Sequence, residues 1–411
     1  RRLARGYWRD RCRPILINNW EATYFDFTEE RLVAIARKAK ECGVELFVLD
    51  DGWFGARRND RAGLGDWIAN PELLPNGISG LADRIEELGM KFGLWIEPEM
   101  VNKDSDLYRK HPDWMLQTPG RRVSHGRYQY VLDFSRKEIV DYIYGMIAKL
   151  LSESNISYIK WDMNRNISDA NSAALPPNRQ GEVMHRYILG VYKLMENLVS
   201  TFPNILFEGC SGGAGRNDPG ILYYMPQNWG SDNTDAVERM YIQYGAGMVY
   251  PSSTICAHVS DVPNHQVGRT TPMKLRSEVA MSAVMGYEFD LSKLTDDECY
   301  DISEQIKQYK RIRSIVCFGD LYRLINPFEN RSASWMYVSE DKTKAVVFYY
   351  NKLAKPNSEI RRLKLKGLDE GKTYIVDNKE YTGRTLMNFG LYLPEYEKDF
   401  ESRAWEIEEK K

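Results

Sequence analysis

Short apolar runs recur along most of the chain, and helical stretches separate many of them. The runs are 15–17, 44–49, 92–96, 128–132, 156–161 and 205–207, followed by two less regular ones at 225–229 and 247–250. Segments such as 28–42 and 139–151 place their apolar residues at the spacing of one helix face. Strands that alternate with helices predict a parallel sheet.

Eight such strands over this length predict a (β/α)8 TIM barrel. A doubly wound sheet is the competing fold, and it needs a glycine-rich fingerprint after its first strand. The first run is followed instead by Asn18-Asn19-Trp20-Glu21. The barrel is therefore the favoured fold.

The pattern changes after about residue 318. Strand-like runs follow at 334–338, 345–350, 360–365 and 373–376, with turn signals at 339–342 and 351–357. We therefore expect a catalytic barrel over 1–325 and a small C-terminal antiparallel β-sandwich over 326–411.

Composition and charge narrow the classes of partner. The formal net charge is −2 and 43% of the residues are hydrophobic, as in ordinary globular proteins. Such a balance gives no reason to expect nucleic acid, and no apolar run approaches the ~20 residues that span a bilayer. The short basic clusters Arg57-Arg58 and Arg121-Arg122 are expected on solvated surface.

Cysteine and histidine spacing argues against a metal site. The six cysteines form no CxxC pair and lack the spacing of a disulfide scaffold, and the five histidines form no HxxxH or HExxH motif. Reduced thiols in the cytoplasm are the simplest interpretation, and neither a metal nor another cofactor is expected.

Several predicted strands end in polar residues that a core would not need. These ends are Asp50-Asp51-Gly52-Trp53, Trp95-Ile96-Glu97-Pro98-Glu99, Lys160-Trp161-Asp162-Met163-Asn164-Arg165 and Trp229-Gly230-Ser231-Asp232-Asn233. In a (β/α)8 barrel the carboxyl ends of the strands form the active-site face. Each carboxylate could instead cap the following helix, but caps need no Trp or Lys beside them.

The run ending at Asp162 is the most informative. Because side chains alternate along a strand, Lys160, Asp162 and Asn164 share one face. A nearby ammonium favours the ionised carboxylate, and an ionised carboxylate suits a nucleophile. A structural Lys160–Asp162 ion pair is the alternative.

Asp232 follows two strands later in the predicted order. Two opposed carboxylates are what glycoside cleavage needs, one to attack and one to donate a proton. Apolar surroundings and the charge of Asp162 would raise the pKa of Asp232, as an acid requires. Asp235 is a rival for this role, although its position before 236 suits a helix cap better.

Aromatic and glycine residues at the strand ends fit a sugar ligand. Trp20, Trp53, Trp95 and Trp229 stand where the apolar face of a sugar could stack, whereas Trp161 is expected in the core. The glycine-rich segment 209–215 lacks the GK[ST] ending of a phosphate loop. Its glycines are better explained by close approach of the backbone to a ligand.

These motifs, in this order, resemble the family 36 α-galactosidases, which are glycoside hydrolases. The matching residues are Asp50-Asp51-Gly52-Trp53, Trp95-Ile96-Glu97-Pro98-Glu99, Lys160-Trp161-Asp162-Met163-Asn164, Cys210-Ser211-Gly212-Gly213 and Ser231-Asp232, with 223–227 and 262–266. The resemblance extends from Asn18 through the C-terminal module.

The resemblance implies a retaining enzyme that releases terminal α-linked galactose from small oligosaccharides of the raffinose or melibiose type, without a cofactor. It assigns the nucleophile to Asp162 and the general acid/base to Asp232. The residues that it implies for substrate binding are Trp20, Asp50, Asp51, Trp95, Arg127, Lys160, Asn164, Cys210 and Gly212. The loop from Cys210 to Gly212 would contact the 2-hydroxyl.

Two features depart from the family. Bacterial members usually open with a large β-supersandwich domain that helps build a tetramer, whereas this chain starts just before its first barrel strand. Either that domain is absent or the chain is a fragment, and the resemblance allows a homo-oligomer. Before Asp232 the chain has Asn228-Trp229-Gly230 where Thr-Trp-Thr is expected, so we expect looser support for the acid/base.

Three other functions fit parts of the pattern. An α-N-acetylgalactosaminidase would need room for an acetamido group beside Cys210. A galactosyl transferase of the raffinose-synthase kind would differ in how well an acceptor competes with water. An inactive sugar-binding barrel is disfavoured because Asp162 and Asp232 are both present.

Overall fold

The computed structural model describes residues 3–357, 360–393 and 398–411. Its parallel strands form a closed barrel in the order β1-β10-β9-β8-β7-β6-β3-β2, so the predicted (β/α)8 architecture is confirmed. The barrel strands are β1 (Leu16–Asn18), β2 (Leu46–Leu49), β3 (Lys91–Ile96), β6 (Tyr158–Trp161), β7 (Leu206–Gly209), β8 (Gln227–Trp229), β9 (Ile255–Ser260) and β10 (Val284–Glu288).

Two of the predicted barrel strands are wrong. The run 128–132 contains β5 (Gln129–Val131), which pairs antiparallel with β4 (Met100–Asn102) outside the barrel. The run 247–250 follows α8 (Ala236–Ala246) as a turn. Instead β9 and β10 complete the barrel, and polar residues inside them obscured the apolar signal. Asp162 therefore follows the fourth barrel strand and Asp232 the sixth, rather than the fifth and seventh.

Local sequence accounts for the boundaries of the first long helix, α2 (Glu29–Cys42). The Thr28 side chain accepts a hydrogen bond from the Arg31 backbone N–H, which caps the helix start. Gly43 ends the helix at φ 99°, a left-handed conformation that glycine adopts without steric cost. The predicted amphipathic helix is confirmed.

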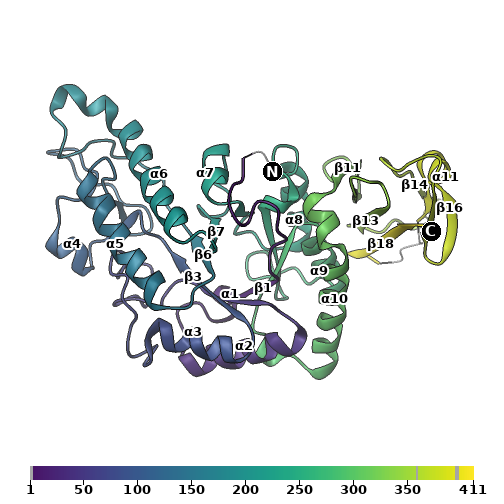
Figure 1. The fold of residues 1–411 in the computed structure, drawn as a ribbon, viewed down its shortest axis with the longest axis horizontal. Coiled ribbons are helices and arrows are strands. Elements are labelled where there is room, and N and C mark those ends of the chain that lie inside the picture. Colours follow the sequence, from purple (N-terminus) through teal and green to yellow (C-terminus); the bar gives the residue numbers. More distant parts are fainter. Residues whose placement is uncertain (1–2, 358–359, 394–397) are drawn as a thin grey trace. The chain divides into compact units, whose positions relative to one another are not determined.

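The remaining helices follow the same alternation with the strands. They are α1 (Trp20–Thr23), α3 (Gly77–Glu87), α4 (Asp106–Lys110), α5 (Lys137–Glu153), α6 (Val183–Thr201), α7 (Pro219–Tyr224), α9 (Met273–Met281), α10 (Asp296–Phe318) and, in the C-terminal module, α11 (Gly383–Asn388). The long helices α5 and α6 pack side by side (Figure 1). No helix of the described chain is long and apolar enough to cross a membrane.

The chain forms two compact units, one of residues 1–229 with 289–295 and the other of 230–288 with 296–411. The first unit contains β1 to β8, and the second contains β9, β10 and the C-terminal module. This division assigns whole barrel strands to both units, and the expected boundary between 325 and 326 stays a prediction.

The C-terminal module contains a six-stranded antiparallel sheet in the order β11-β12-β13-β18-β15-β16, and a two-stranded sheet, β14-β17. The strands are β11 (Asp320–Ile325), β12 (Ser332–Val338), β13 (Lys344–Asn351), β14 (Arg362–Leu363), β15 (Thr373–Val376), β16 (Lys379–Thr382), β17 (Leu391–Tyr392) and β18 (Glu401–Glu409). The predicted antiparallel module is therefore confirmed.

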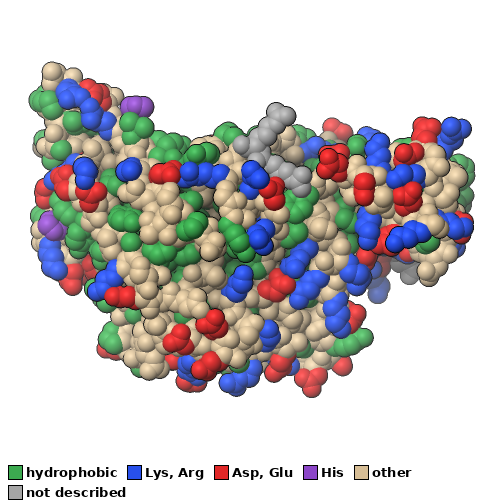
Figure 2. All heavy atoms as spheres, in the orientation of Figure 1, with side chains coloured by type: hydrophobic (Ala, Val, Ile, Leu, Met, Phe, Trp, Pro, Cys, Tyr) green, Lys and Arg blue, Asp and Glu red, His purple; other side chains and the backbone are tan. Residues whose placement is uncertain are grey.

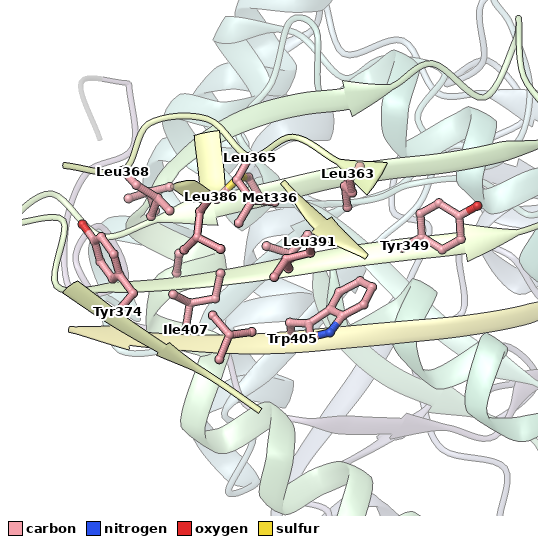
Figure 3. Packing of buried hydrophobic residues seen from close by; sticks show 14 residues of the cluster. Met336, Tyr349, Leu363, Leu365, Leu368, Tyr374, Leu386, Leu391, Trp405 and Ile407 are labelled. Atoms are coloured by element: carbon pink, nitrogen blue, oxygen red, sulfur yellow. The ribbon is translucent and has the colours of Figure 1, made fainter. Parts of the chain in front are cut away.

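One face of the six-stranded sheet packs against α11 and the β14-β17 pair (Figure 3). Alternate residues of its strands point into this core because side chains alternate along a strand. The core consists of Met336, Val338, Ala345, Val347, Tyr349, Leu363, Leu365, Leu368, Tyr374, Val376, Leu386, Leu391, Trp405 and Ile407.

The opposite face of β12 and β13 is buried as well. The hydroxyl of Tyr337 donates to the Ser282 carbonyl oxygen at 2.7 Å, and that of Tyr350 donates to the Glu278 carbonyl oxygen at 3.0 Å. Burial on both faces explains why these two strands read as continuous apolar runs rather than as alternating ones.

The six cysteines differ in their bonding state. Cys12, Cys210, Cys256 and Cys317 carry free thiols, whereas Cys42 and Cys299 are disulfide-bonded, so the expectation of reduced thiols is wrong for these two. Lys and Arg side chains are interspersed with Asp and Glu side chains over the face drawn in Figure 2.

The core of the C-terminal module should be sensitive to cavity formation. Leu386 is fully buried, so Leu386→Ala should lower the free energy of unfolding by about 2–5 kcal/mol. Leu353 is 48% exposed, and the matched Leu353→Ala should change it by only about 0.5 kcal/mol. Denaturant unfolding of both variants checks this, and equal effects would contradict the packing described.

Candidate active site

Four neighbouring barrel strands bring the predicted strand-end residues together. In the parallel pairing, Trp95 lies opposite Lys160, and Lys160 lies opposite Glu208. Parallel strands present their carboxyl ends at the same edge, so the residues after β2, β3, β6 and β7 share one end of the barrel.

Asp50, just after β2, accepts hydrogen bonds from two other side chains of the site. Its Oδ2 accepts hydrogen bonds from Lys160 Nζ at 2.8 Å and from Asn18 Nδ2 at 2.6 Å. The Lys160 and Asp50 side chains are only 7% and 4% exposed. Lys160 therefore forms a buried ion pair with Asp50.

Asp51 is held by Arg57 in a bidentate ion pair. Arg57 Nε lies 2.7 Å from Asp51 Oδ1, and Nη2 lies 2.6 Å from Oδ2. Burial raises the pKa of Asp51, and the Arg57 charge opposes that shift. Arg57 is 1% exposed, so the expectation of a solvated Arg57 is wrong, whereas Arg58 is exposed.

The two aspartates diverge because β2 ends at Leu49 and the chain turns at Gly52. Gly52 has φ 109°, and a Cβ there would lie 3.0 Å from the Phe25 ring. Both the backbone conformation and the close approach therefore require glycine.

Asp162 is a buried carboxylate with many donors. Trp95 Nε1 donates to Oδ2 at 3.1 Å, and the backbone N–H groups of Met163 and Gly212 donate to Oδ1 at 2.8 and 3.4 Å. Burial alone would raise the pKa of Asp162, but the charge of Lys160 and hydrogen bonds from the Cys210, Asn164 and Trp95 side chains lower it. Asp162 is therefore held ionised.

The glycine-rich loop after β7 lies directly against Asp162. Gly212 and Gly213 have φ of 55° and 89°, which lets the loop bend back toward β6. Ser211 Oγ donates to the Met163 carbonyl oxygen at 2.8 Å, which fixes the loop to the chain beyond Asp162. The expected role of these glycines, close approach of the backbone, agrees with this geometry.

The other predicted binding residues lie around the same strand ends. Trp229 is 2% exposed, and Lys160 Nζ lies 5.6 Å from its ring centroid. Trp20 begins α1 after β1, with its ring edge-on to Phe25. Arg127 is exposed in a left-handed conformation at φ 51°, and its charge acts on Asp51.

Trp53 does not provide a sugar-binding face. It is fully buried, donates from Nε1 to the Trp95 carbonyl oxygen at 2.9 Å, and packs against Phe54 and Trp67. The prediction for Trp53 is wrong because a Trp at a strand end also serves as core. Trp161 is fully buried, as expected.

Glu97 and Glu99 are buried carboxyl groups to which no sequence motif assigned a role. Glu97 accepts hydrogen bonds from the Asn164 backbone N–H and from Gln129 Nε2. Glu99 accepts from Trp161 Nε1 at 2.9 Å and lies 2.6 Å from Arg216 Nη1. Their position after β3 was the one sequence signal that placed them near the site. Their roles could not be predicted, because the residues that bond them come from distant segments.

The second unit contains Asp232, which is exposed in the segment after β8. Gln266 Nε2 donates to its backbone carbonyl oxygen at 2.9 Å. Asp235 accepts from the backbone N–H groups of Val237 and Glu238 and caps α8, as predicted.

Arg239 supports the chain before Asp232 in a way that the sequence did not reveal. Its Nη2 donates to the Ser231 carbonyl oxygen at 2.6 Å, and its Nη1 to the Cys256 carbonyl oxygen at 3.2 Å. A Cβ on Gly230 would lie 2.6 Å from Arg239 Nη1. The guanidinium thus occupies space that the expected β-branched side chain would fill, and the expected looser support of the acid/base stays a prediction.

Within the part of the chain that the structure describes, no group of three or more His, Cys, Asp or Glu residues could hold a metal ion. The carboxylates of the site are bonded to cations, amides and indoles instead. The absence of a cofactor stays a prediction.

Comparison with known proteins gives consistent matches over the whole chain. The Melibiase family matches residues 1–319, and the glycosyl hydrolase family 36 C-terminal domain matches residues 332–407. Alpha-galactosidase AgaA of Geobacillus stearothermophilus is 56% identical over 99% of this chain and 56% of its own length. Alpha-galactosidase Mel36A of Lactobacillus acidophilus is 48% identical over 98% of this chain and 55% of its own length.

Solved structures show the same relationship. The crystal structure of AgaA superposes with a TM-score of 0.98 at 55% identity, covering 99% of this chain and 57% of the solved one. The chain thus spans a little over half the length of the relatives that it matches. On these matches and on its barrel and C-terminal module, the chain belongs to the melibiase family of glycoside hydrolase family 36.

Proposed function

We propose that this chain carries the catalytic barrel of a retaining α-galactosidase, with Asp162 as the nucleophile and Asp232 as the general acid/base. The observation that carries the proposal is the set of hydrogen-bond donors that surrounds the buried Asp162 carboxylate. Lys160 and the donors around Asp162 lower its pKa against the effect of burial. A buried carboxylate held in its charged form is ready to attack an electrophilic carbon.

The reaction would proceed by double displacement. Asp162 attacks the anomeric carbon while Asp232 protonates the departing glycosidic oxygen, which gives a covalent galactosyl–enzyme. Asp232, now a carboxylate, takes a proton from water, and that water releases galactose with its original α configuration.

Recognition of galactose would depend on Asp50, Asp51 and Lys160. Galactose and glucose differ in the direction of the 4-hydroxyl, and these groups offer acceptors and a donor at one edge of the site. AgaA structures have been solved with raffinose and with stachyose, which supports a small α-galactoside as the substrate of this chain.

The proposal includes a cytoplasmic location, no metal or redox cofactor and neither nucleic acid nor membrane as a partner. It allows a homo-oligomer. The four free thiols support the location, whereas the disulfide-bonded Cys42 and Cys299 argue against it. The missing metal-ligand spacing in the sequence supports the cofactor assignment.

Asp162→Asn should abolish turnover while preserving the fold. Loss of the attacking carboxylate should lower kcat on p-nitrophenyl α-galactoside by several powers of ten. Asp297→Asn changes an exposed aspartate in α10 in the same way and should leave kcat unchanged. Proton NMR of the wild-type reaction should show α-galactose first. Near-normal turnover by folded Asp162→Asn, or β-galactose as the first product, would refute the assignment.

The wild type should strongly prefer α-galactosides to α-glucosides. A glucoside would direct its 4-hydroxyl away from the carboxylates of Asp50 and Asp51, and a site built to bond a substrate hydroxyl rejects an analogue that lacks the contact by about 10⁴–10⁵ in specificity. Asp51→Ala should therefore lower kcat/KM on the galactoside far more than on the glucoside. The measurement is kcat/KM on the two p-nitrophenyl epimers. Similar wild-type values would contradict galactose recognition, and an unchanged ratio in the variant would exclude Asp51 from it.

The acid limb of the pH profile should report the pKa of Asp162. Activity requires ionised Asp162, so it should be lost only as pH falls through a pKa below the ordinary value of about 3.9. Lys160→Met removes the charge that lowers this pKa, so the acid limb of kcat/KM should move to higher pH. Lys307→Met removes an exposed charge and should leave the limb in place. An unmoved limb in Lys160→Met would contradict the electrostatic role of Lys160.

A further inference from the structure

The segment that carries Asp162 is fixed residue by residue. The backbone N–H of Asp162 donates to the Ile96 carbonyl oxygen at 2.8 Å and continues the β3–β6 pairing. The N–H of Met163 donates to the Asp162 carboxylate at 2.8 Å. The next N–H, that of Asn164, donates to Glu97 Oε1, so a side chain replaces the strand partner where the pairing ends.

Glu97 is itself held in a fixed position. Its side chain is fully buried, and its Oε2 accepts from Gln129 Nε2 at 3.1 Å. The Gln129 carbonyl oxygen accepts from Arg165 Nη1 at 2.8 Å, and Arg165 follows Asn164 in the chain. Glu97, Gln129 and Arg165 thus connect β5 to the segment just beyond Asp162.

We propose that Glu97 is a positioning residue for the nucleophile, because its carboxyl group holds the Asn164 backbone and so fixes the Asp162–Asn164 segment. The inference rests on the proposed function, and it adds a residue to which that function assigned no role. Asn164 links Glu97 to the nucleophile, because its backbone N–H donates to Glu97 and its side chain hydrogen-bonds the Asp162 carboxylate.

The charges around Glu97 make this role dependent on pH. Burial and the negative charge of Asp162 raise the pKa of Glu97 to about 8. Asp51 acts in the same direction, while Arg57 and the Asn164 backbone N–H act against it. At neutral pH Glu97 is therefore protonated and the Asp162–Glu97 pair carries one negative charge, on Asp162. Above pH 8 a second charge appears beside the nucleophile and repels it.

Substitutions at Glu97 test whether this residue positions Asp162 or only stabilises the fold. Glu97→Ala should lower kcat by about 10²-fold with little change in KM, as displacement of a catalytic group by about 1 Å does. Glu97→Gln keeps an acceptor oxygen for Asn164 and should restore kcat close to the wild-type value at neutral pH. Glu278→Ala removes another buried carboxyl group, on α9, and should leave kcat unchanged.

The pH profile gives a readout that a purely structural role would not move. p-Nitrophenyl α-galactoside has a leaving group that departs without protonation. The kcat/KM on this substrate is therefore insensitive to the protonation state of the general acid, Asp232. On this substrate the wild-type kcat/KM should fall as pH rises through about 8, where Glu97 ionises. Glu97→Gln cannot ionise and should lose that alkaline limb. This measurement also applies if Glu97→Ala fails to fold.

The outcomes distinguish this inference from the proposed function. If the wild type does not hydrolyse the galactoside, the proposed function fails. If the wild type is active, the inference alone is overturned when folded Glu97→Ala keeps its kcat, or when Glu97→Gln retains the alkaline limb.

Discussion

Two buried ion pairs at the end of β2 determine the arrangement of the candidate site. Lys160 with Asp50 and Arg57 with Asp51 place four charged side chains where water is largely excluded. Removing one partner from such a pair costs about 3–5 kcal/mol, because the other charge is left buried and unpaired. The turn at Gly52 lets the two neighbouring carboxylates diverge, so that Asp50 meets Lys160 of β6 and Asp51 meets Arg57 of the following loop.

The charge on Asp162 depends on the same constraint. Lys160 bonds Asp50, yet its ammonium still acts on Asp162 and lowers the pKa of that carboxyl group. Glu97 sits beside Asp162 with a raised pKa, so the two neighbouring carboxyl groups differ in protonation at neutral pH. Lys160 and the indole N–H of Trp95 favour the charged form of Asp162. Burial and the like charge of Asp162 disfavour the charged form of Glu97.

The sequence predicted the barrel, the C-terminal module and the strand-end position of Asp162 because periodicity and strand-end chemistry are local signals. It mispredicted 128–132 and 247–250 as barrel strands, and it missed β9, in which His258 and Ser260 interrupt the apolar pattern. Arg57 could not be recognised as buried, since its partner Asp51 is reached only through a folded loop. Gln129 and Arg239 were missed for the same reason: their roles depend on contacts with residues far along the chain or across a turn.

The contact between Gly230 and Arg239 has a consequence for how sequences of this kind can vary. The guanidinium fills the volume beside residue 230 and binds the Ser231 carbonyl oxygen, so a side chain at 230 and a long cation at 239 compete for one space. Side-chain volume at position 230 is therefore coupled to the placement of the cation at position 239, since a side chain at 230 requires the guanidinium to move. A branched residue at 230 would displace the guanidinium from the Ser231 carbonyl oxygen, so its steric cost would be carried to the backbone next to Asp232.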